Sequence, residues 1–404
     1  MRWARRLSLT LAVVTMAHGA LAAPDAPACA TFDCFLKALW PDAQARGVSQ
    51  SVFDAALANV SPDPQVLALA NSAPEYVRPA GTYIGARISA AMIAAGRRHA
   101  ERLSDTLDRI EQQYGVEREI LVSIWAIESG FGAVKGKHDV IRALATLAHA
   151  RFRGDDFFRD ELLHALAILQ AGDVPRRHLV GSWAGAMGQP QFLPSSFLKY
   201  AADGSGDGRR DIWTNVPDVL ASIANYFRNF GWKRGSPWGF EVSVPPSHDL
   251  RVSRGTFAEW HARGLRRTDG EAFPANGDAY LLHPAGEIGP AFLVTENYVV
   301  IKRYNFSDPY ALAVAHLADR MRGAPPWHRI WPNERPLSRA DRIALQRALA
   351  ALGYSVANTV GHIDFDQRDI IRALQVDFRM VADGNPDAAL LERVQRKAAE
   401  TTKR

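Results

Sequence analysis

A single carboxylate near the end of an otherwise apolar segment is the strongest candidate for chemistry in this chain. Residues 120–132 have the apolar spacing of a buried helix that ends at its two glycines. Ile120, Ile124 and Glu128 would share one face of that helix. Burial raises the pKa of a carboxylic acid, so Glu128 would keep its proton near neutral pH and could serve as a general acid. A glutamate that turns to solvent or pairs with an arginine is the structural alternative.

Residues 181–196 combine glycines with neutral hydrogen-bonding side chains and aromatic rings. Ser182, Gln189 and Gln191 supply neutral donors and acceptors, and the small residues let a ligand approach the backbone closely. This mixture suits a sugar better than a phosphate. Composition alone favours a tight structural loop.

Residues 203–211 follow the opening of an EF-hand calcium loop, with oxygen-bearing side chains at the first, third and fifth positions and a glycine at the sixth. The twelfth position holds Thr214 instead of the usual glutamate, so Asp218 would close the site from a longer loop. The sequence predicts a structural Ca²⁺ site, and a solvated turn is the alternative. The expected ligands are Asp203, Ser205, Asp207 and Asp218.

The first 23 residues are typical of a secretory signal peptide, with three arginines before a short apolar core and small residues at the cleavage site. Removal of these arginines lowers the net charge from +5 to +2, which weakens the case for a nucleic-acid partner. No cysteine follows the apolar core directly, so we expect a periplasmic protein without a lipid anchor. In that oxidising compartment Cys29 and Cys34 should form a disulfide.

A chain of 404 residues predicts several domains. We expect helices in a region at 24–95 and in a core at 96–233, which a helix at 305–323 would complete. Alternating runs at 280–282, 291–294 and 298–302 predict strands of a small β domain at 234–304. A proline-rich linker at 324–336 would isolate a helical domain at 337–398, making that tail dispensable for chemistry. The expected fold class is mainly α (α+β).

Taken together, these segments resemble the membrane-bound lytic murein transglycosylase B family of bacterial cell-wall enzymes over about residues 30–323. The resemblance implies a lysozyme-like helical core with an added helical region and a small β domain. The tail resembles the three-helix peptidoglycan-binding type 1 domain, although its loop at 361–366 departs from the usual pattern. The matching segments of the main part are Tyr114–Gly132, Leu144–Ala148, Gly181–Ser196, Asp203–Trp213, Ala224–Phe227 and Gly231-Trp232.

The resemblance implies an enzyme that cleaves the bond between N-acetylmuramic acid and N-acetylglucosamine in peptidoglycan and leaves 1,6-anhydro ends. Glu128 matches the single residue that acts first as acid and then as base. The resemblance implies that the chemistry needs no cofactor and that the protein is a monomer that binds glycan strands. Proteins of wall synthesis or remodelling are possible partners. The residues that match the substrate groove are Tyr83, Ser182, Gln191, Tyr226, Tyr298 and Tyr304.

Two other functions remain open from the sequence. Most glycosidases use two carboxylates, and the sequence near Glu128 singles out no second one. This favours attack on C1 by the C6 hydroxyl of the substrate itself. A hydrolytic muramidase would instead need a second carboxylate placed over a water molecule. A catalytically silent protein that binds the cell wall would tolerate the loss of Glu128.

Overall fold

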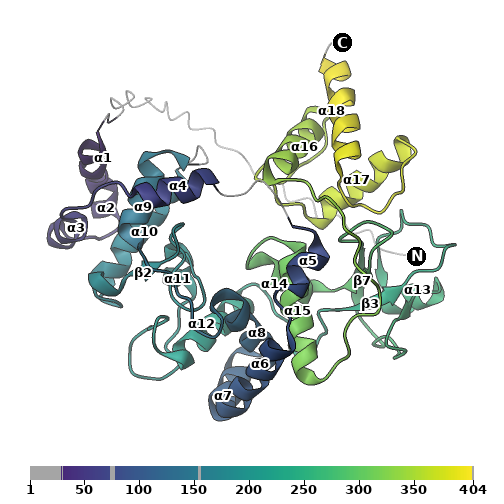
Figure 1. The fold of residues 1–404 in the computed structure, drawn as a ribbon, viewed down its shortest axis with the longest axis horizontal. Coiled ribbons are helices and arrows are strands. Elements are labelled where there is room, and N and C mark those ends of the chain that lie inside the picture. The colour runs from purple at the N-terminus through teal and green to yellow at the C-terminus, as the bar shows by residue number, and fades with distance from the viewer. Residues whose placement is uncertain (1–28, 30, 73–77, 153–155, 403–404) are drawn as a thin grey trace, which may run out of the picture.

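The described part of the protein is mainly helical, as expected, with one two-stranded and one five-stranded sheet. The computed structural model describes residue 29 and the ranges 31–72, 78–152 and 156–402, so the predicted signal peptide lies outside the described residues. In the described ranges no helix is both long enough and apolar enough to span a bilayer. Figure 1 shows the N-terminal helices on one side, the sheet on the other, and the C-terminal helices above the sheet.

Among the described residues, five short helices precede the core: α1 (Phe32–Ala38), α2 (Trp40–Ala45), α3 (Gln50–Leu57), α4 (Pro64–Ser72) and α5 (Ala80–Gly85). The helices of the core are α6 (Ala90–Arg102), α7 (Ser104–Tyr114), α8 (Arg118–Ser129), α9 (Val140–His149), α10 (Phe157–Ala171), α11 (Pro194–Tyr200) and α12 (Val216–Asn229). Two short strands pair within it, β1 (His138–Asp139) and β2 (Val180–Gly181). The helices that follow are α13 (Phe257–Ala262), α14 (Glu296–Arg303), α15 (Asp308–Arg322), α16 (Arg339–Ala351), α17 (Phe365–Asp377) and α18 (Ala388–Thr402).

Helix α8 is the central element of the core. Residues 120–126 are all buried, because α6, α12 and α15 pack around the helix. Helix α15 runs antiparallel to α8: Arg322 pairs with Glu119 at one end, and Tyr310 bonds to Glu128 at the other. Gly130 ends α8 in the left-handed conformation, with φ of +57°, which a glycine adopts without steric cost.

The small sheet is antiparallel throughout, in the order β4 (Arg254–Thr256), β6 (Asp278–Leu282), β7 (Ala291–Val294), β3 (Gly239–Ser243), β5 (Arg266–Arg267). The prediction of a strand at 298–302 is wrong, since these residues belong to α14. The Thr295 hydroxyl caps this helix by accepting from the Asn297 amide. Asn297, Tyr298 and Ile301 lie on its buried side, at the spacing of a helix rather than a strand.

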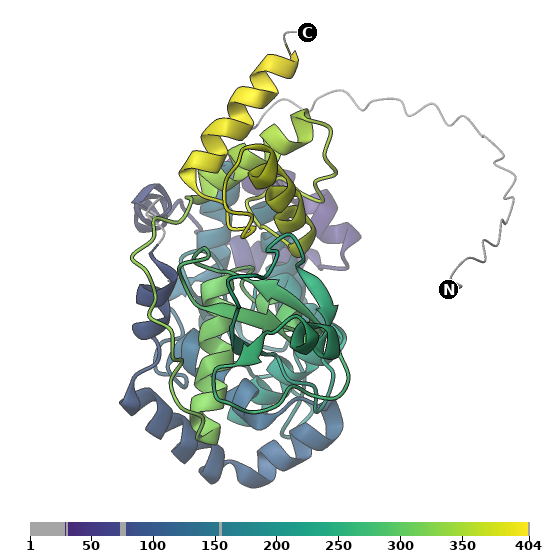
Figure 2. The same cartoon turned by 90° about the vertical axis from the view of Figure 1, so that its right-hand side faces the viewer.

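The C-terminal helices α16, α17 and α18 share a separate apolar core, but the proline-rich segment does not isolate them. Helix α17 contacts the sheet directly, where the ring of Phe365 stacks on Tyr280 with 3.9 Å between the ring centroids. Figure 2 shows the three helices seated on the sheet side of the molecule. The expectation that the linker isolates this domain is therefore wrong.

The start of the described chain is held by a disulfide between Cys29 and Cys34. Cys34 lies in α1, whose N-terminus is capped by the Thr31 hydroxyl. The disulfide therefore ties the residues that precede α1 to its first turn.

Candidate active site

Glu128 lies in the last turn of α8, where the apolar helix reaches the surface of the core. Its buried neighbours on the same face are Ile120 and Ile124, as the sequence predicts. Burial raises the pKa of Glu128 to about 7, and a hydrogen bond from Tyr310 and the charge of Arg87 oppose the rise. The helix C-terminus carries a partial negative charge, which also disfavours the ionised carboxylate. Glu128 is therefore suited to donate a proton near neutral pH.

Tyr310 determines which oxygen of Glu128 can donate. Its hydroxyl donates to Glu128 Oε1 over 2.5 Å, and burial raises the pKa of Tyr310 well above 10, so it stays a neutral donor. An oxygen that accepts from Tyr310 acts as the carbonyl of the acid, and the transferable proton then belongs to Oε2. Tyr310 could not be found from the sequence, because it lies 182 residues from Glu128 and its surroundings carry no sugar-binding pattern.

Tyr83 and Arg87 form the side of the site that comes from α5 and the residues after it. The Arg87 guanidinium lies 3.8 Å from the centroid of the Tyr83 ring. Burial raises the pKa of Tyr83, Arg87 lowers it, and Glu128 adds to the rise, so all three side chains lie within electrostatic reach of one another. Tyr83 was expected at the site. Arg87 was not, since an isolated arginine carries no signal in the sequence.

Tyr304 connects the glycine-rich segment to Glu128. Its hydroxyl donates to the carbonyl of Pro190 over 2.7 Å, and its ring stacks on Tyr310 with centroids 6.4 Å apart. Burial raises the pKa of Tyr304 well above 10, with a further contribution from Glu128. The segment that includes Gln191 is therefore brought close to the acid.

Ser182 and Gln191 shape the glycine-rich segment itself. The Ser182 hydroxyl accepts from the amides of Ala184 and Ala186, over 3.3 and 3.0 Å. Gln191 has φ of +54°, and its amide donates to the Gly188 carbonyl over 2.7 Å. Both side chains are partly exposed and retain capacity for a ligand.

Gln189, a neutral donor and acceptor in the sequence analysis, faces the interior. Its carbonyl oxygen accepts from the Trp125 indole over 2.6 Å and its amide donates to the Trp213 carbonyl over 3.0 Å. It joins α8 to the segment before α12 and offers nothing to a ligand.

Two of the tyrosines that were expected to contact sugar are buried beneath the site. Tyr298 is fully buried and its hydroxyl donates to Asp308 over 2.7 Å, so the expectation of a sugar contact there is corrected. Tyr226 is 8% exposed, and its hydroxyl donates to the Arg303 carbonyl over 2.9 Å. The Tyr226 ring packs on Tyr304 at 4.9 Å between centroids, which places it in the wall rather than at the surface.

Two carboxylates of the segment between α11 and α12 lie beside a third in the first turn of α12. Oxygens of Asp203, Asp207 and Asp218 lie within 4.8 Å of one another. Asp218 is fully buried, and burial raises its pKa although it accepts from the amides of Gly204, Ser205 and Asp211. Hard oxygen donors at this spacing fit a Ca²⁺ ion, whose charge would offset the desolvation of Asp218.

The carboxylate of Asp211, which lies later in the same segment, has a structural role. It accepts from the amides of Trp213 and Thr214, both over less than 3 Å, and so caps the turn before α12.

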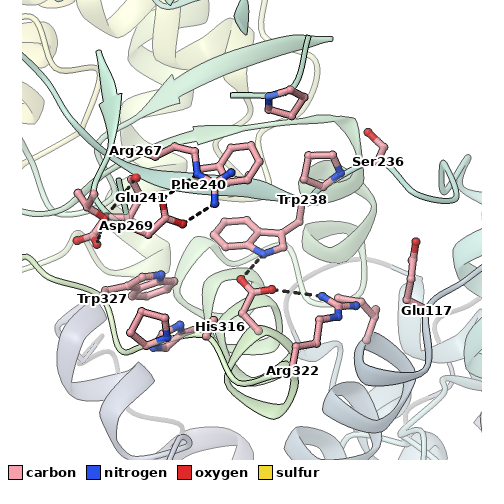
Figure 3. A pocket seen from close by; sticks show the side chains of 18 of the residues that line it. Glu117, Ser236, Trp238, Phe240, Glu241, Arg267, Asp269, His316, Arg322 and Trp327 are labelled. Carbon is pink, nitrogen blue, oxygen red and sulfur yellow. Dashed lines mark hydrogen bonds and ion pairs between the residues drawn. The ribbon is translucent and has the colours of Figure 1, made fainter. Parts of the chain in front are cut away.

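A cavity of about 490 Å³ lies at the other end of the α8–α15 pair. Figure 3 shows its walls, which come from α8, α15, β3 and the residues after α15. There Trp238 donates to Asp319, which also accepts from Arg322. Ile120 lines the cavity two turns of α8 before Glu128, so the cavity is separate from the site of the acid.

Known proteins resemble both parts of the chain. Residues 31–319 match the family described as "Transglycosylase SLT domain", and residues 338–394 match the "Putative peptidoglycan binding domain". Membrane-bound lytic murein transglycosylase B of Escherichia coli K12 is 36% identical over 221 residues, which cover 53% of this chain. The aligned part spans 59% of the length of that curated relative.

The likeness to one solved structure extends into the tail. SltB3 from Pseudomonas aeruginosa, in complex with NAG-anhNAM-pentapeptide, aligns with a TM-score of 0.80 and 41% identity over 91% of this chain and all of that one. Escherichia coli lytic transglycosylase Slt35, in complex with calcium, aligns with a TM-score of 0.61 and 29% identity over 72% of this chain and 92% of that one.

Proposed function

Because the chain belongs to the transglycosylase SLT domain family, we propose that it is a peptidoglycan lytic transglycosylase. It cleaves the bond between N-acetylmuramic acid and N-acetylglucosamine and forms a 1,6-anhydromuramyl end. The observation that carries this proposal is the lone acid. Within the described ranges, burial, Tyr310 and Arg87 account for the shifted pKa of Glu128, and none of these is a second carboxylate.

The chemistry follows from that arrangement. Glu128 donates its Oε2 proton to the glycosidic oxygen as the bond from that oxygen to C1 of the muramyl residue breaks. The resulting carboxylate accepts the proton of the muramyl C6 hydroxyl as the oxygen of that hydroxyl bonds to C1. No water is consumed, and intramolecular attack gains from proximity. Arg87 and the Tyr310 hydroxyl stabilise the carboxylate between the two transfers.

The sugar contacts belong to the partly exposed residues around Glu128. Ser182 and Gln191 orient hydroxyl and N-acetyl groups, and Tyr83 and Tyr304 offer ring faces to the sugars. The solved relative SltB3 binds muropeptide fragments with and without the anhydro end, which supports a groove of this kind here.

The proposal also includes a calcium ion, a wall-binding domain and a cellular compartment. Asp203, Ser205, Asp207 and Asp218 bind a structural calcium ion, and no step of the reaction passes through it. The domain at 337–398 binds peptidoglycan, and the enzyme acts in the periplasm as a monomer, open to partners in wall synthesis or remodelling. Sedimentation of Glu128→Gln with insoluble sacculi, with and without a stop after Pro336, tests the binding domain.

Mass spectrometry of the muropeptides released from purified sacculi tests the reaction. A lytic transglycosylase releases ends that lack one water relative to a hydrolysed end. Reducing ends alone would identify a hydrolytic muramidase. No release by the wild type, together with binding to sacculi, would identify a silent wall-binding protein.

A further inference from the structure

The C-terminal domain reaches the active site through one buried ion cluster at the start of α15. Asp308, the first residue of α15, accepts from Arg368 of α17 through Oδ2, at 2.8 Å. Through Oδ1 it accepts from Tyr298 and Lys302, at 2.7 and 2.8 Å. The side chains of Asp308 and Arg368 are only 11% and 5% exposed. Burial raises the pKa of Asp308, but Lys302 and Arg368 together hold it below its usual value.

The first turn of α15 leads from this cluster to the acid. Ser307 caps the helix by accepting from the Tyr310 amide, and Tyr310 lies two residues after Asp308. The Tyr310 hydroxyl holds Glu128, so the cluster fixes the turn that presents this hydroxyl. A displacement of about 1 Å at such a position can cost about a hundredfold in rate.

The proline-rich segment is also fixed to the core, so it does not let the C-terminal domain move freely. Figure 3 shows Trp327 against His316 of α15, with ring centroids 4.0 Å apart, and the amides of His328 and Arg329 donate to Glu241. Further along, Glu334 accepts from the amide of Ala80, over 2.5 Å, at the start of α5, the helix that carries Tyr83.

We propose that the C-terminal domain is part of the machinery that positions the active site. Arg368 is the positioning residue: it acts on Asp308, and through the first turn of α15 on Tyr310 and Glu128. This inference rests on the proposed role of Glu128 as the acid. The domain is then a structural part of the catalytic unit as well as a module for wall binding.

The kinetics of three variants on short soluble glycans test the proposal. Arg368→Met should lower kcat by about tenfold or more with little change in KM, because the bond from Tyr310 is misplaced. The bond from Tyr310 lowers the pKa of Glu128. Its loss should therefore raise that pKa and move the alkaline limb of the pH–rate profile to higher pH. Arg368→Lys should restore part of kcat and part of the wild-type position of the alkaline limb. None of these variants mutates a group that faces Glu128. Those groups are Tyr83, Arg87, Tyr304 and Tyr310.

Arg372→Met is the matched control. Arg372 lies one turn later in α17, is equally buried, and donates to Tyr280 and to the Leu281 carbonyl of the sheet instead of to α15. This variant weakens the same domain contact, so its melting temperature should fall while kcat and the alkaline limb stay at the wild-type values. An equal loss of kcat in Arg372→Met would overturn the proposal.

A double-mutant cycle identifies the route. In a Tyr310→Phe background, Arg368→Met should cause no further loss of kcat, since its effect passes through the missing hydroxyl. Additive losses would overturn the route. If Arg368→Met fails to fold by circular dichroism, Asp308→Asn tests the same contact from α15, with the same expected shift of the limb.

The outcomes separate this inference from the proposed function. If Glu128→Gln remains active, the acid is misassigned and both proposals fail. If Glu128→Gln is inactive while folded Arg368→Met has the kcat and pH profile of the wild type, only the positioning role is wrong.

Discussion

Glu128 combines a buried position with two neighbours that favour its ionised form. Burial raises its pKa to about 7, while the Tyr310 hydroxyl and the Arg87 charge limit that rise. An acid with this balance can release its proton at the glycosidic oxygen and take one back in the next step. A fully apolar surrounding would hold the proton too tightly for the second role.

Replacement of Glu128 by Gln should abolish cleavage and leave the fold intact. The amide keeps the shape of the acid and removes only the transferable proton, which is worth about 10²–10⁴-fold in rate. Release of muropeptides from sacculi measures the effect. Glu119→Gln, on the same helix and paired with Arg322, is the control and should retain activity. A Glu128→Gln rate above about a tenth of the wild type contradicts a general acid.

The pH dependence of kcat/KM should show an alkaline limb near the pKa of Glu128, about 7. Activity falls as the acid ionises, because the ionised form has no proton to donate. Initial rates on soluble glycans between pH 5 and about 9 measure the limb. A flat profile across this range is incompatible with Glu128 as the acid.

Glu128 should also cost stability at high pH. A pKa raised from 4.5 to about 7 means that the folded state binds the proton more tightly than the unfolded state. Stability therefore falls as the pH rises between these two values, by about 3 kcal/mol at most. Glu128→Gln should raise the melting temperature relative to the wild type at pH about 8 and change it little at pH about 4. An equal change at both pH values would contradict a raised pKa.

The acid could be predicted from the sequence, but its partners could not. Glu128 stands out because its helix is apolar on every side, which is a local pattern. Tyr310 and Arg87 reach it only through tertiary packing, from residues whose local sequence has no special feature. Tyr298 matched the groove by resemblance, yet folding turns it inward to Asp308.

Elements were predictable where one pattern dominated. The buried helix α8 lies close to its expected bounds, since its apolar residues repeat with helical spacing. Residues 298–301 are aromatic or β-branched, which favours a strand, but the cap at Thr295 and packing on α15 make residues 298–302 part of α14. Tertiary context outweighed propensity there.

Calcium should stabilise the protein through the segment between α11 and α12. The three clustered carboxylates repel one another, and a bound cation removes that repulsion, so the melting temperature should rise with added Ca²⁺. Thermal scans with and without Ca²⁺ measure the rise, which Asp207→Ala should lose. Asp249→Ala removes an exposed carboxylate elsewhere and should respond as the wild type does. An undiminished response of Asp207→Ala places the ion at another site.

At the scale of the whole molecule, the C-terminal domain is joined to the rest by polar contacts that are at least partly buried. Besides the Arg368–Asp308 pair, Ser253 donates to Asp369 over 2.7 Å, and Lys302 donates to the Ile363 carbonyl over 2.9 Å. No local pattern in the sequence pairs these residues, so composition alone made the preceding segment look like a free tether.

The full chain should unfold in a single thermal transition, because the contacts between its parts are buried and would be lost together. Differential scanning calorimetry at neutral pH measures this. Arg372→Met removes contacts to the sheet and should separate a C-terminal transition from the main one. Two transitions already in the wild type would show that the domains are thermodynamically independent.

The bond between Tyr310 and Glu128 also affects the order in which the protein gains its properties. A chain delivered N-terminus first presents α8 long before α15, since 182 residues separate the two partners. The entire small sheet must be made and folded between them, and such non-local contacts form late. A nascent chain therefore carries its acid without the hydroxyl that holds it. An enzyme assembled in this order reaches its full rate of cleavage only after the first turn of α15 has been made.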